Sequence, residues 1–194
     1  EEADVFGWPE LEFDDNSELD LVKLKREQQR EAIRNLVVSE DHIKAAWEFY
    51  EKVLGKPKFW CAPMVGASEL AFRMMVRKYG THIASTPMIS SGGYVQSERY
   101  RENFRFLDDS SDRPLIVQFW ANNGESMLGA TRLVEGKCDA VEINLGCPQQ
   151  CARSGHYGAF LLNKPEILYE IVSTVAQNSN VPILCKVRIF KDYN

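Results

Sequence analysis

Three polar side chains stand at or near the ends of three apolar segments of this sequence. Gln118 lies near the end of the run 114–119, Asn144 ends the run 140–144, and Lys186 lies within the run 181–187. A buried amide or ammonium group without a partner costs about 1–3 kcal/mol or more. If these segments are neighbouring strands, something polar is needed to satisfy all three side chains.

Each of the three residues also has a simpler explanation. Gln118 can cap the following helix, Asn144 can form a turn, and the long side chain of Lys186 can extend to solvent. Three such residues at three successive strand ends nevertheless favour a binding site. A planar group such as a flavin ring carries the carbonyl oxygens and ring nitrogens that these donors and acceptors need.

Cys147 is a candidate for proton transfer. It lies between Gly146 and Pro148, in a tight turn directly after a predicted strand. Most cysteines with apolar neighbours are inert packing groups, but this turn would present the thiol to a site. A free thiol with a pKa near 8.5 is mostly protonated at neutral pH and can donate a proton. Cys151 stays ambiguous, and we expect no zinc or other metal site, because neither a histidine nor a second close cysteine pair accompanies these two.

Short apolar runs alternate with helical segments along the chain. The predicted strands are 58–62, 82–85, 114–119, 140–144 and 181–187, and the predicted helices are 68–79, 98–104, 125–134 and 165–177. Strands rich in Val, Ile and Leu that are each followed by a helix indicate parallel βα units. About five such units without a Gly-x-Gly-x-x-Gly turn favour part of a (β/α)₈ TIM barrel, and a doubly wound sheet is the alternative.

A further helix is predicted for residues 41–54, ahead of the first strand. Four large side chains recur on it at helical spacing: Ile43, Trp47, Tyr50 and Leu54. Such a stripe is typical of an amphipathic helix that packs on a core. We therefore expect this stripe to be buried.

The first 38 residues differ in charge from the rest. Residues 1–20 carry nine carboxylates and neither Lys nor Arg, and a basic stretch follows at 23–34. Residues 21–194 carry 23 basic and 19 acidic side chains, although the whole chain has a net charge of −5. We expect 1–38 to be an acidic and then basic, helical and partly disordered extension, and 39–194 to be the barrel part. The charge balance neither requires nor excludes a nucleic acid.

The composition excludes several classes of protein. With 44% hydrophobic and 26% charged residues the chain is globular, and it has no apolar run that could span a membrane. Its five cysteines form no paired framework, which fits a reducing compartment. The chain begins without Met and ends soon after the fifth predicted strand, so we expect this segment by itself to be an inactive part of a barrel.

Several blocks of sequence, in order, resemble the dihydrouridine synthase family. They are Ala-Pro-Met-Val at 62–65, Ser-Glu-Leu-Ala-Phe-Arg at 68–73, Thr-Pro-Met-Ile at 86–89, Arg-Pro-Leu-Ile-Val-Gln-Phe at 113–119, Val-Glu-Ile-Asn-Leu-Gly-Cys-Pro-Gln at 141–149, Gly-His-Tyr-Gly-Ala-Phe-Leu at 155–161 and Cys-Lys-Val-Arg at 185–188. The Asn-x-Gly-Cys-Pro block is the most specific. Trp-Glu-Phe-Tyr at 47–50 is similar to the eukaryotic branch that acts on positions 16 and 17 of the tRNA D-loop.

The resemblance implies an FMN-dependent enzyme that reduces uridine to 5,6-dihydrouridine in tRNA, with NADPH or NADH as reductant. It implies a monomer that is cytoplasmic, or also nuclear, and that binds tRNA and no membrane. The residues carried over by motif are the proton donor Cys147, the flavin-lining backbone of Pro63, Met64 and Val65, the ring contacts Gln118 and Lys186, and Asn144, which would hold the flavin or the base.

Two departures from the family pattern affect substrate detail. Ser91-Gly92-Gly93 stands where a His and bulkier residues are expected, and Glu142 replaces the commoner Asp. Two other functions are open. One is a different FMN barrel reductase of the dihydroorotate dehydrogenase or old-yellow type, against which the Asn-x-Gly-Cys-Pro block argues. The other is a shortened, non-catalytic variant that acts only as a binding protein.

Overall fold

The computed structural model describes residues 27, 28 and 30–189. The strands within these residues are all parallel: β1 (Trp60–Cys61), β2 (Ile83–Ser85), β3 (Ile89–Ser90), β4 (Leu115–Trp120), β5 (Ala140–Leu145) and β6 (Ile183–Val187). They form one sheet in the order β1-β2-β4-β5-β6, with β3 beside β4. Sequential parallel neighbours linked by helices confirm the prediction of an incomplete (β/α)₈ barrel.

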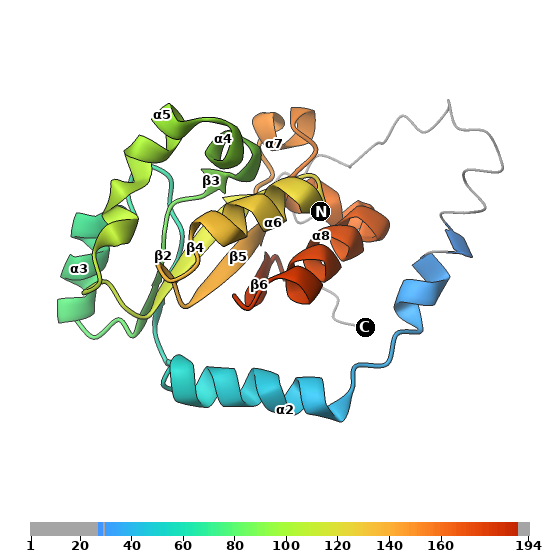
Figure 1. Ribbon diagram of the computed structural model, residues 1–194, viewed down its shortest axis with the longest axis horizontal. Coiled ribbons are helices and arrows are strands. Elements are labelled where there is room, and N and C mark those ends of the chain that lie inside the picture. Colours follow the sequence, from blue (N-terminus) through green and yellow to red (C-terminus); the bar gives the residue numbers. More distant parts are fainter. Residues whose placement is uncertain (1–26, 29, 190–194) are drawn as a thin grey trace, which may run out of the picture.

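Helices connect the strands of this sheet (Figure 1). They are α3 (Leu70–Lys78), α4 (Ser91–Gln96), α5 (Glu98–Arg101), η2 (Glu102–Asp108), α6 (Gly124–Leu133), α7 (Gln150–Ser154), η3 (Gly158–Asn163) and α8 (Pro165–Asn178). The structure differs from the sequence prediction between 89 and 96, where β3 and α4 occupy a Gly/Ser-rich stretch for which neither was predicted. The Ser90 hydroxyl caps α4 by accepting a hydrogen bond from the N–H of Gly93 at 3.1 Å.

Side chains of β4 and β5 alternate between two layers. The outer layer packs against α6 and α8 and contains Leu115, Val117, Phe119, Val141, Ile143 and Leu145. The inner layer contains Ile116 and Ala140, together with Leu54 and Ile83. Because a strand has a period of two residues, Gln118, Glu142 and Asn144 belong to the inner side of the half-barrel.

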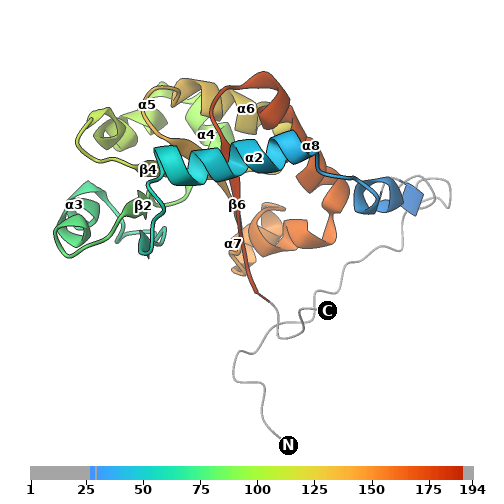
Figure 2. The ribbon, with the colours of Figure 1, turned by 90° about the horizontal axis from the view of Figure 1, so that it is seen from below.

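The helix before β1 is not buried along the predicted stripe. It consists of α2 (Glu40–Glu48) followed by a π-helical turn, η1 (Phe49–Val53), and it crosses the N-terminal end of the sheet (Figures 1 and 2). Leu54 is buried as predicted, but Ile43 and Trp47 are 47% and 61% exposed. Ala45, Ala46 and Phe49 line the groove between this helix and β6 instead. Tyr50 of the predicted stripe is half-buried, and no residue of α2 is buried, so the prediction of a buried stripe was wrong for Ile43 and Trp47.

The N-terminal extension lies largely outside the described residues. Residues 30–34 are helical, and Arg30 Nη2 donates a hydrogen bond to the carbonyl oxygen of Asn163 at 3.2 Å. Arg30 Nε also lies 3.5 Å from Glu166 Oε2. Among the described residues, no helix is both long and apolar enough to cross a membrane.

Candidate active site

Three neighbouring strands bring polar side chains to the inner side of the half-barrel. Gln118 on β4 is in register with Glu142 on β5, and Asn144 on β5 is in register with Lys186 on β6. In parallel sheets the carboxyl ends of the strands lie at one edge. The register therefore places Gln118, Asn144 and Lys186, which were singled out from sequence, on adjacent strands at that edge.

A chain of hydrogen bonds joins the buried side chains of this set. Gln118 Nε2 donates to Glu142 Oε1 at 2.6 Å, and Asn144 Nδ2 donates to Gln118 Oε1 at 2.9 Å. Asn144 Oδ1 accepts hydrogen bonds from the backbone N–H groups of Gly146 and Cys147, each at 3.0 Å. A continuous path of polar contacts thus runs from Glu142 to the backbone of the candidate proton donor.

The turn fixes the orientation of both amides in this chain. Backbone N–H groups can only donate, so Asn144 must turn its oxygen towards Gly146 and Cys147. Its amide nitrogen then faces Gln118, which must present its own oxygen and direct its nitrogen to Glu142. Glu142 is therefore needed as an acceptor at the end of the chain.

Glu142 is a buried carboxyl group with few partners. It is 4% exposed and lies in the middle of β5. Burial raises the pKa of Glu142 to about 7, an effect that the hydrogen bond from Gln118 and the positive charge of Lys186 only partly offset. Its charge therefore changes close to neutral pH.

Cys147 lies half-buried in a turn that several contacts hold in place. Its carbonyl oxygen accepts a hydrogen bond from the N–H of Ala159 at 3.0 Å, so the loop after α7 packs directly on it. Gly158 has φ +68° there, and a Cβ atom at that position would meet the Cys147 carbonyl oxygen at 2.6 Å. Only glycine suits this contact, because any other side chain would collide with the backbone of the turn.

The two candidate cysteines have different surroundings. Cys147 packs with Trp120 and Tyr157, whose rings stack with centroids 4.2 Å apart. Cys151 is exposed, and its sulfur accepts a hydrogen bond from the Tyr157 hydroxyl at 3.5 Å. The structure therefore places Cys147 at the amide chain and Cys151 one helical turn further on, at the surface.

The cations of β6 lie beside this turn. Lys186 is exposed on the open side of the half-barrel, and its charge lowers the pKa of Glu142. Arg188 Nε donates a short hydrogen bond to the carbonyl oxygen of Gly146. Arg188 thus holds the turn from the side opposite to Asn144, whereas Lys186 keeps its ammonium group accessible at the edge of the site.

The loop after β1 contains the other predicted site residues. Met64 and Val65 are 38% and 71% exposed, and Pro63 is half-buried. Met64 accepts a hydrogen bond at its carbonyl oxygen from the N–H of Ser68 at 2.9 Å, and its own N–H donates to Ser68 Oγ at 2.8 Å. The buried Ser68 side chain therefore determines the shape of this loop.

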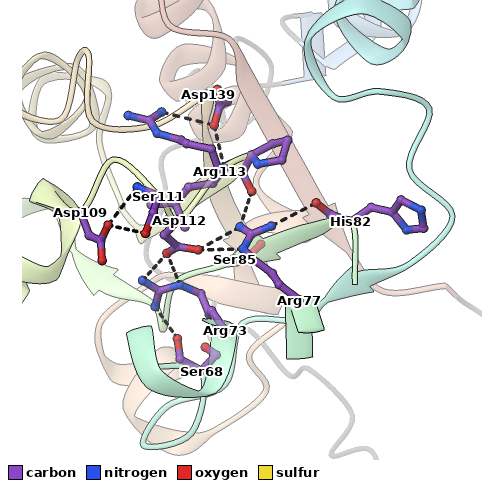
Figure 3. Close-up of polar contacts among 12 residues, drawn as sticks. Ser68, Arg73, Arg77, His82, Ser85, Asp109, Ser111, Asp112, Arg113 and Asp139 are labelled. Atoms are coloured by element: carbon purple, nitrogen blue, oxygen red, sulfur yellow. Dashed lines mark hydrogen bonds and ion pairs between the residues drawn. The ribbon is translucent and has the colours of Figure 1, made fainter. Parts of the chain in front are cut away.

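A buried ionic cluster in turn holds Ser68 (Figure 3). Arg73 Nη1 donates to the Ser68 carbonyl oxygen at 2.6 Å, and Arg73 Nε donates to Asp112 Oδ2 at 2.8 Å. Arg77 Nε donates to the second oxygen of Asp112 at 3.0 Å, and Arg77 also reaches the carbonyl oxygens of His82 and Pro114. The cluster links α3 to the N-terminal ends of β2 and β4.

Sequence reasoning missed three parts of this arrangement. Glu142 was noted only as a departure from a family pattern, although an acid inside the apolar run 140–145 is a signal of its own. Arg188 appeared only as the last residue of the block Cys-Lys-Val-Arg, without a role. Arg73 and Asp112 carried no signal, because they are 39 positions apart and meet only in the folded chain.

The chemistry of these donors fits a flavin ring. An amide nitrogen carries two hydrogens, and the bond to Glu142 uses one of those of Gln118. Lys186 adds an accessible ammonium group one strand away. Lys186 can donate to the carbonyl oxygens and ring nitrogens of a planar ligand beside a turn that carries a thiol, whereas Gln118 is 1% exposed and can contact such a ligand only if its second amide hydrogen becomes accessible.

Comparison with known proteins identifies the family. The sequence model of the dihydrouridine synthase (Dus) family matches residues 60–194. The tRNA-dihydrouridine(16/17) synthase of Saccharomyces cerevisiae, named with NAD(P)+, is 48% identical over 147 residues, which are 75% of this chain and 34% of the yeast protein. A Mus musculus protein named as similar to that enzyme is 40% identical over 75% of this chain and 31% of its own length.

A relative with a different position in its name is comparably similar. A Homo sapiens protein named tRNA-dihydrouridine(20a/20b) synthase-like is 42% identical over 135 residues, which are 68% of this chain and 42% of the human protein. The chain thus spans between about a third and two fifths of the length of these relatives.

Proposed function

The chain belongs to the dihydrouridine synthase family, and we propose that the protein that contains it reduces uridine to 5,6-dihydrouridine in tRNA. We further propose FMN as its flavin, NADPH or NADH as its reductant, and D-loop positions 16 and 17 as its targets. The 48% identity to the yeast 16/17 enzyme supports these positions. The comparable identity of the human 20a/20b relative makes positions 20a and 20b the alternative targets.

One observation carries this proposal. The Cys147 turn is bound through Asn144 and Gln118 to a strand edge that also presents Lys186. A proton donor fixed beside a set of hydrogen-bond donors is what a reduction needs, because hydride and proton must reach adjacent carbons of one base.

Each residue then has a defined task. FMN, when bound, supplies the hydride that reaches C6 of the uracil ring. Cys147 donates the proton at C5, and Lys186 and Gln118 hold and orient the flavin ring through hydrogen bonds. Asn144 keeps the Cys147 turn in place by accepting from its backbone N–H.

The loop after β1 contributes shape rather than charge. Ser68 occupies both backbone polar groups of Met64, so we propose that Pro63 and Val65 supply the backbone contacts to the flavin and Met64 mainly its side chain. The uridine would have to leave the folded tRNA to reach this site, as enzymes that act on a base require. We also propose that the protein is monomeric and works in the cytoplasm or also in the nucleus.

Purified full-length protein tests this function directly. We expect flavin absorbance, oxidation of NADPH or NADH, and dihydrouridine at positions 16 and 17 of unmodified tRNA, mapped by mass spectrometry of nuclease fragments. Loss of dihydrouridine in the Cys147→Ala variant with retained flavin would support the assigned roles. A protein that binds flavin but leaves tRNA uridines unreduced under these conditions would overturn the proposal.

A further inference from the structure

The chain of hydrogen bonds through the amides of Asn144 and Gln118 depends on the acceptor at its end, Glu142. Asn144 directs its amide nitrogen to Gln118, and Gln118 directs its own nitrogen to Glu142 at 2.6 Å. The oxygen of Asn144 is held by backbone N–H groups of the turn, but its nitrogen is held by Gln118, whose own nitrogen needs an acceptor in turn. Glu142 is the group that provides it.

We propose that Glu142 is a positioning residue for the reduction, which acts through Gln118 and Asn144 to order the turn that carries Cys147. This inference rests on the proposed function for its chemistry but on hydrogen bonds alone for the ordering of the turn. Glu142 touches neither the thiol nor its backbone, and three successive hydrogen bonds through two intervening residues link it to the N–H of Cys147.

The depth of Glu142 supports this role. An acid at a surface would be hydrated and would bind Gln118 weakly, whereas Glu142 is 4% exposed. In a medium of low polarity a hydrogen bond to a carboxylate is about twice as strong as one to a neutral acceptor. Gln118 is 1% exposed, so water offers little competition for its nitrogen.

The charge of Glu142 adds a dependence on pH. Its pKa lies at about 7 because of burial, so the carboxyl group is ionised above neutral pH and largely protonated below it. The titratable groups that share its surroundings are Lys186 and Cys185 on β6, His42 on α2 and Tyr50 in η1. Lys186 favours the ionised form, and Gln118 on β4 donates to it.

A flavin-independent measurement tests the ordering. In full-length protein, hydrogen exchange of the N–H groups of Gly146 and Cys147 should speed up about tenfold in Glu142→Ala, because Gln118 and Asn144 lose their anchor. Glu142→Gln keeps an acceptor and should restore slow exchange. Glu135→Ala, which removes an exposed acid at the other end of β5, is the control and should change nothing.

A single-turnover measurement tests the link to chemistry. With reduced enzyme and tRNA, the ratio of the wild-type rate to the Glu142→Gln rate should rise about fivefold from pH 5.5 to pH 8, as a charge-assisted acceptor replaces a neutral one. Glu142→Asp should retain this rise. Both Cys147 and the flavin are common to all variants, so their own titration cancels in the ratio.

The two measurements separate this inference from the proposed function. Unchanged exchange at Gly146 and Cys147 in Glu142→Ala would overturn the positioning role, whatever the activity. A ratio that stays flat with pH would overturn the role of the charge. If the wild type reduces no tRNA, the proposed function fails, while the exchange measurement still decides whether Glu142 orders the turn.

Discussion

Two buried carboxylates, Asp112 and Glu142, sit in opposite electrostatic surroundings. Asp112 is fully buried and has a guanidinium group on each of its oxygens, with Arg73 Nη2 at 2.7 Å and Arg77 Nη2 at 2.9 Å. Glu142 is almost as deep but has one amide donor and a more distant ammonium group. Two guanidinium groups therefore balance the negative charge of ionised Asp112, whereas the negative charge of ionised Glu142 is only partly balanced.

The difference separates a structural network from a functional one. The Asp112 cluster joins α3 to the starts of β2 and β4 and reaches the loop after β1 only through the carbonyl oxygen of Ser68 (Figure 3). The Glu142 chain runs along the inner side of the sheet towards the turn of Cys147. An undercompensated acid costs stability, and such acids are concentrated where a charge is needed for chemistry. Substitutions in the two networks should therefore have effects of different kinds.

The largest expected effect is a loss in the rate of uridine reduction when Cys147, at the end of the Glu142 chain, is replaced. Cys147→Ala in full-length protein should slow uridine reduction by about 10²–10⁴-fold, because a positioned acid contributes that much, and it should leave flavin binding unchanged. Single-turnover oxidation of the reduced flavin by tRNA measures it. Cys151→Ala is the matched control, since that thiol is exposed and away from the amide chain. Equal rates for the two variants would contradict the separate roles.

The structural network should respond in stability instead. Asp112→Ala leaves two guanidinium groups without their shared anion and should reduce the free energy of unfolding by about 3–5 kcal/mol, as measured by urea denaturation. The control is Asp109→Ala in the same loop, whose carboxylate accepts hydrogen bonds from the N–H and the hydroxyl of Ser111 and lies at the surface. Comparable losses of unfolding free energy in both variants would mean that the buried cluster contributes no more to stability than a surface carboxylate does.

The comparison also shows which features could be predicted from sequence. The runs around β4 and β5 predicted the strands because both are apolar on two faces, and their terminal amides stood out against them. The pairing of Gln118 with Glu142 could not be derived, because it depends on the strand register. The Arg73–Asp112 pair was hidden for the same reason, since an arginine in an amphipathic helix is normally expected at the surface.

Helix packing was the least predictable feature. The stripe chosen on α2 followed the size of Ile43 and Trp47, but the helix turns Ala45 and Ala46 to the groove. Both alanines stay exposed and no residue of α2 is buried, so the periodicity of large side chains did not predict how this helix lies on the sheet. The short β3 and α4 were missed because Gly and Ser are weak signals of either strand or helix.

A third test addresses the cost of the Glu142 charge. The pKa of Glu142 in the folded protein is about 7, above the ordinary value of 4.5. Below pH 4.5 the group is protonated in both states and costs nothing, and above pH 7 it is ionised in both and the full cost is present. Glu142→Gln should therefore stabilise the protein by up to about 3 kcal/mol at pH 8 and by little at pH 4.5.

Thermal denaturation across this range measures the difference. The exposed Glu135→Gln variant is the control, and its difference from wild type should not vary with pH in this way. A stabilisation that is equal at pH 4.5 and pH 8 would show that Glu142 is compensated as well as Asp112, and the contrast between the two networks would disappear.

The smallest expected effect concerns Lys186, the cation that partly balances Glu142. If Lys186 donates to the flavin as proposed, Lys186→Met removes that donor but nearly retains the length of the side chain, so the affinity for FMN should fall about tenfold, the value of one charge-assisted hydrogen bond at an accessible site. Quenching of flavin fluorescence on binding measures the affinity. Lys137→Met, which changes a lysine near the other end of β5, should leave the affinity for FMN unchanged.

Because Lys186 also favours the ionised form of Glu142, its loss should raise the pKa of that carboxyl further, and the midpoint of the pH-dependent stability should move upward. Weaker FMN binding with an unmoved midpoint would show that Lys186 serves the ligand alone and has no share in balancing Glu142.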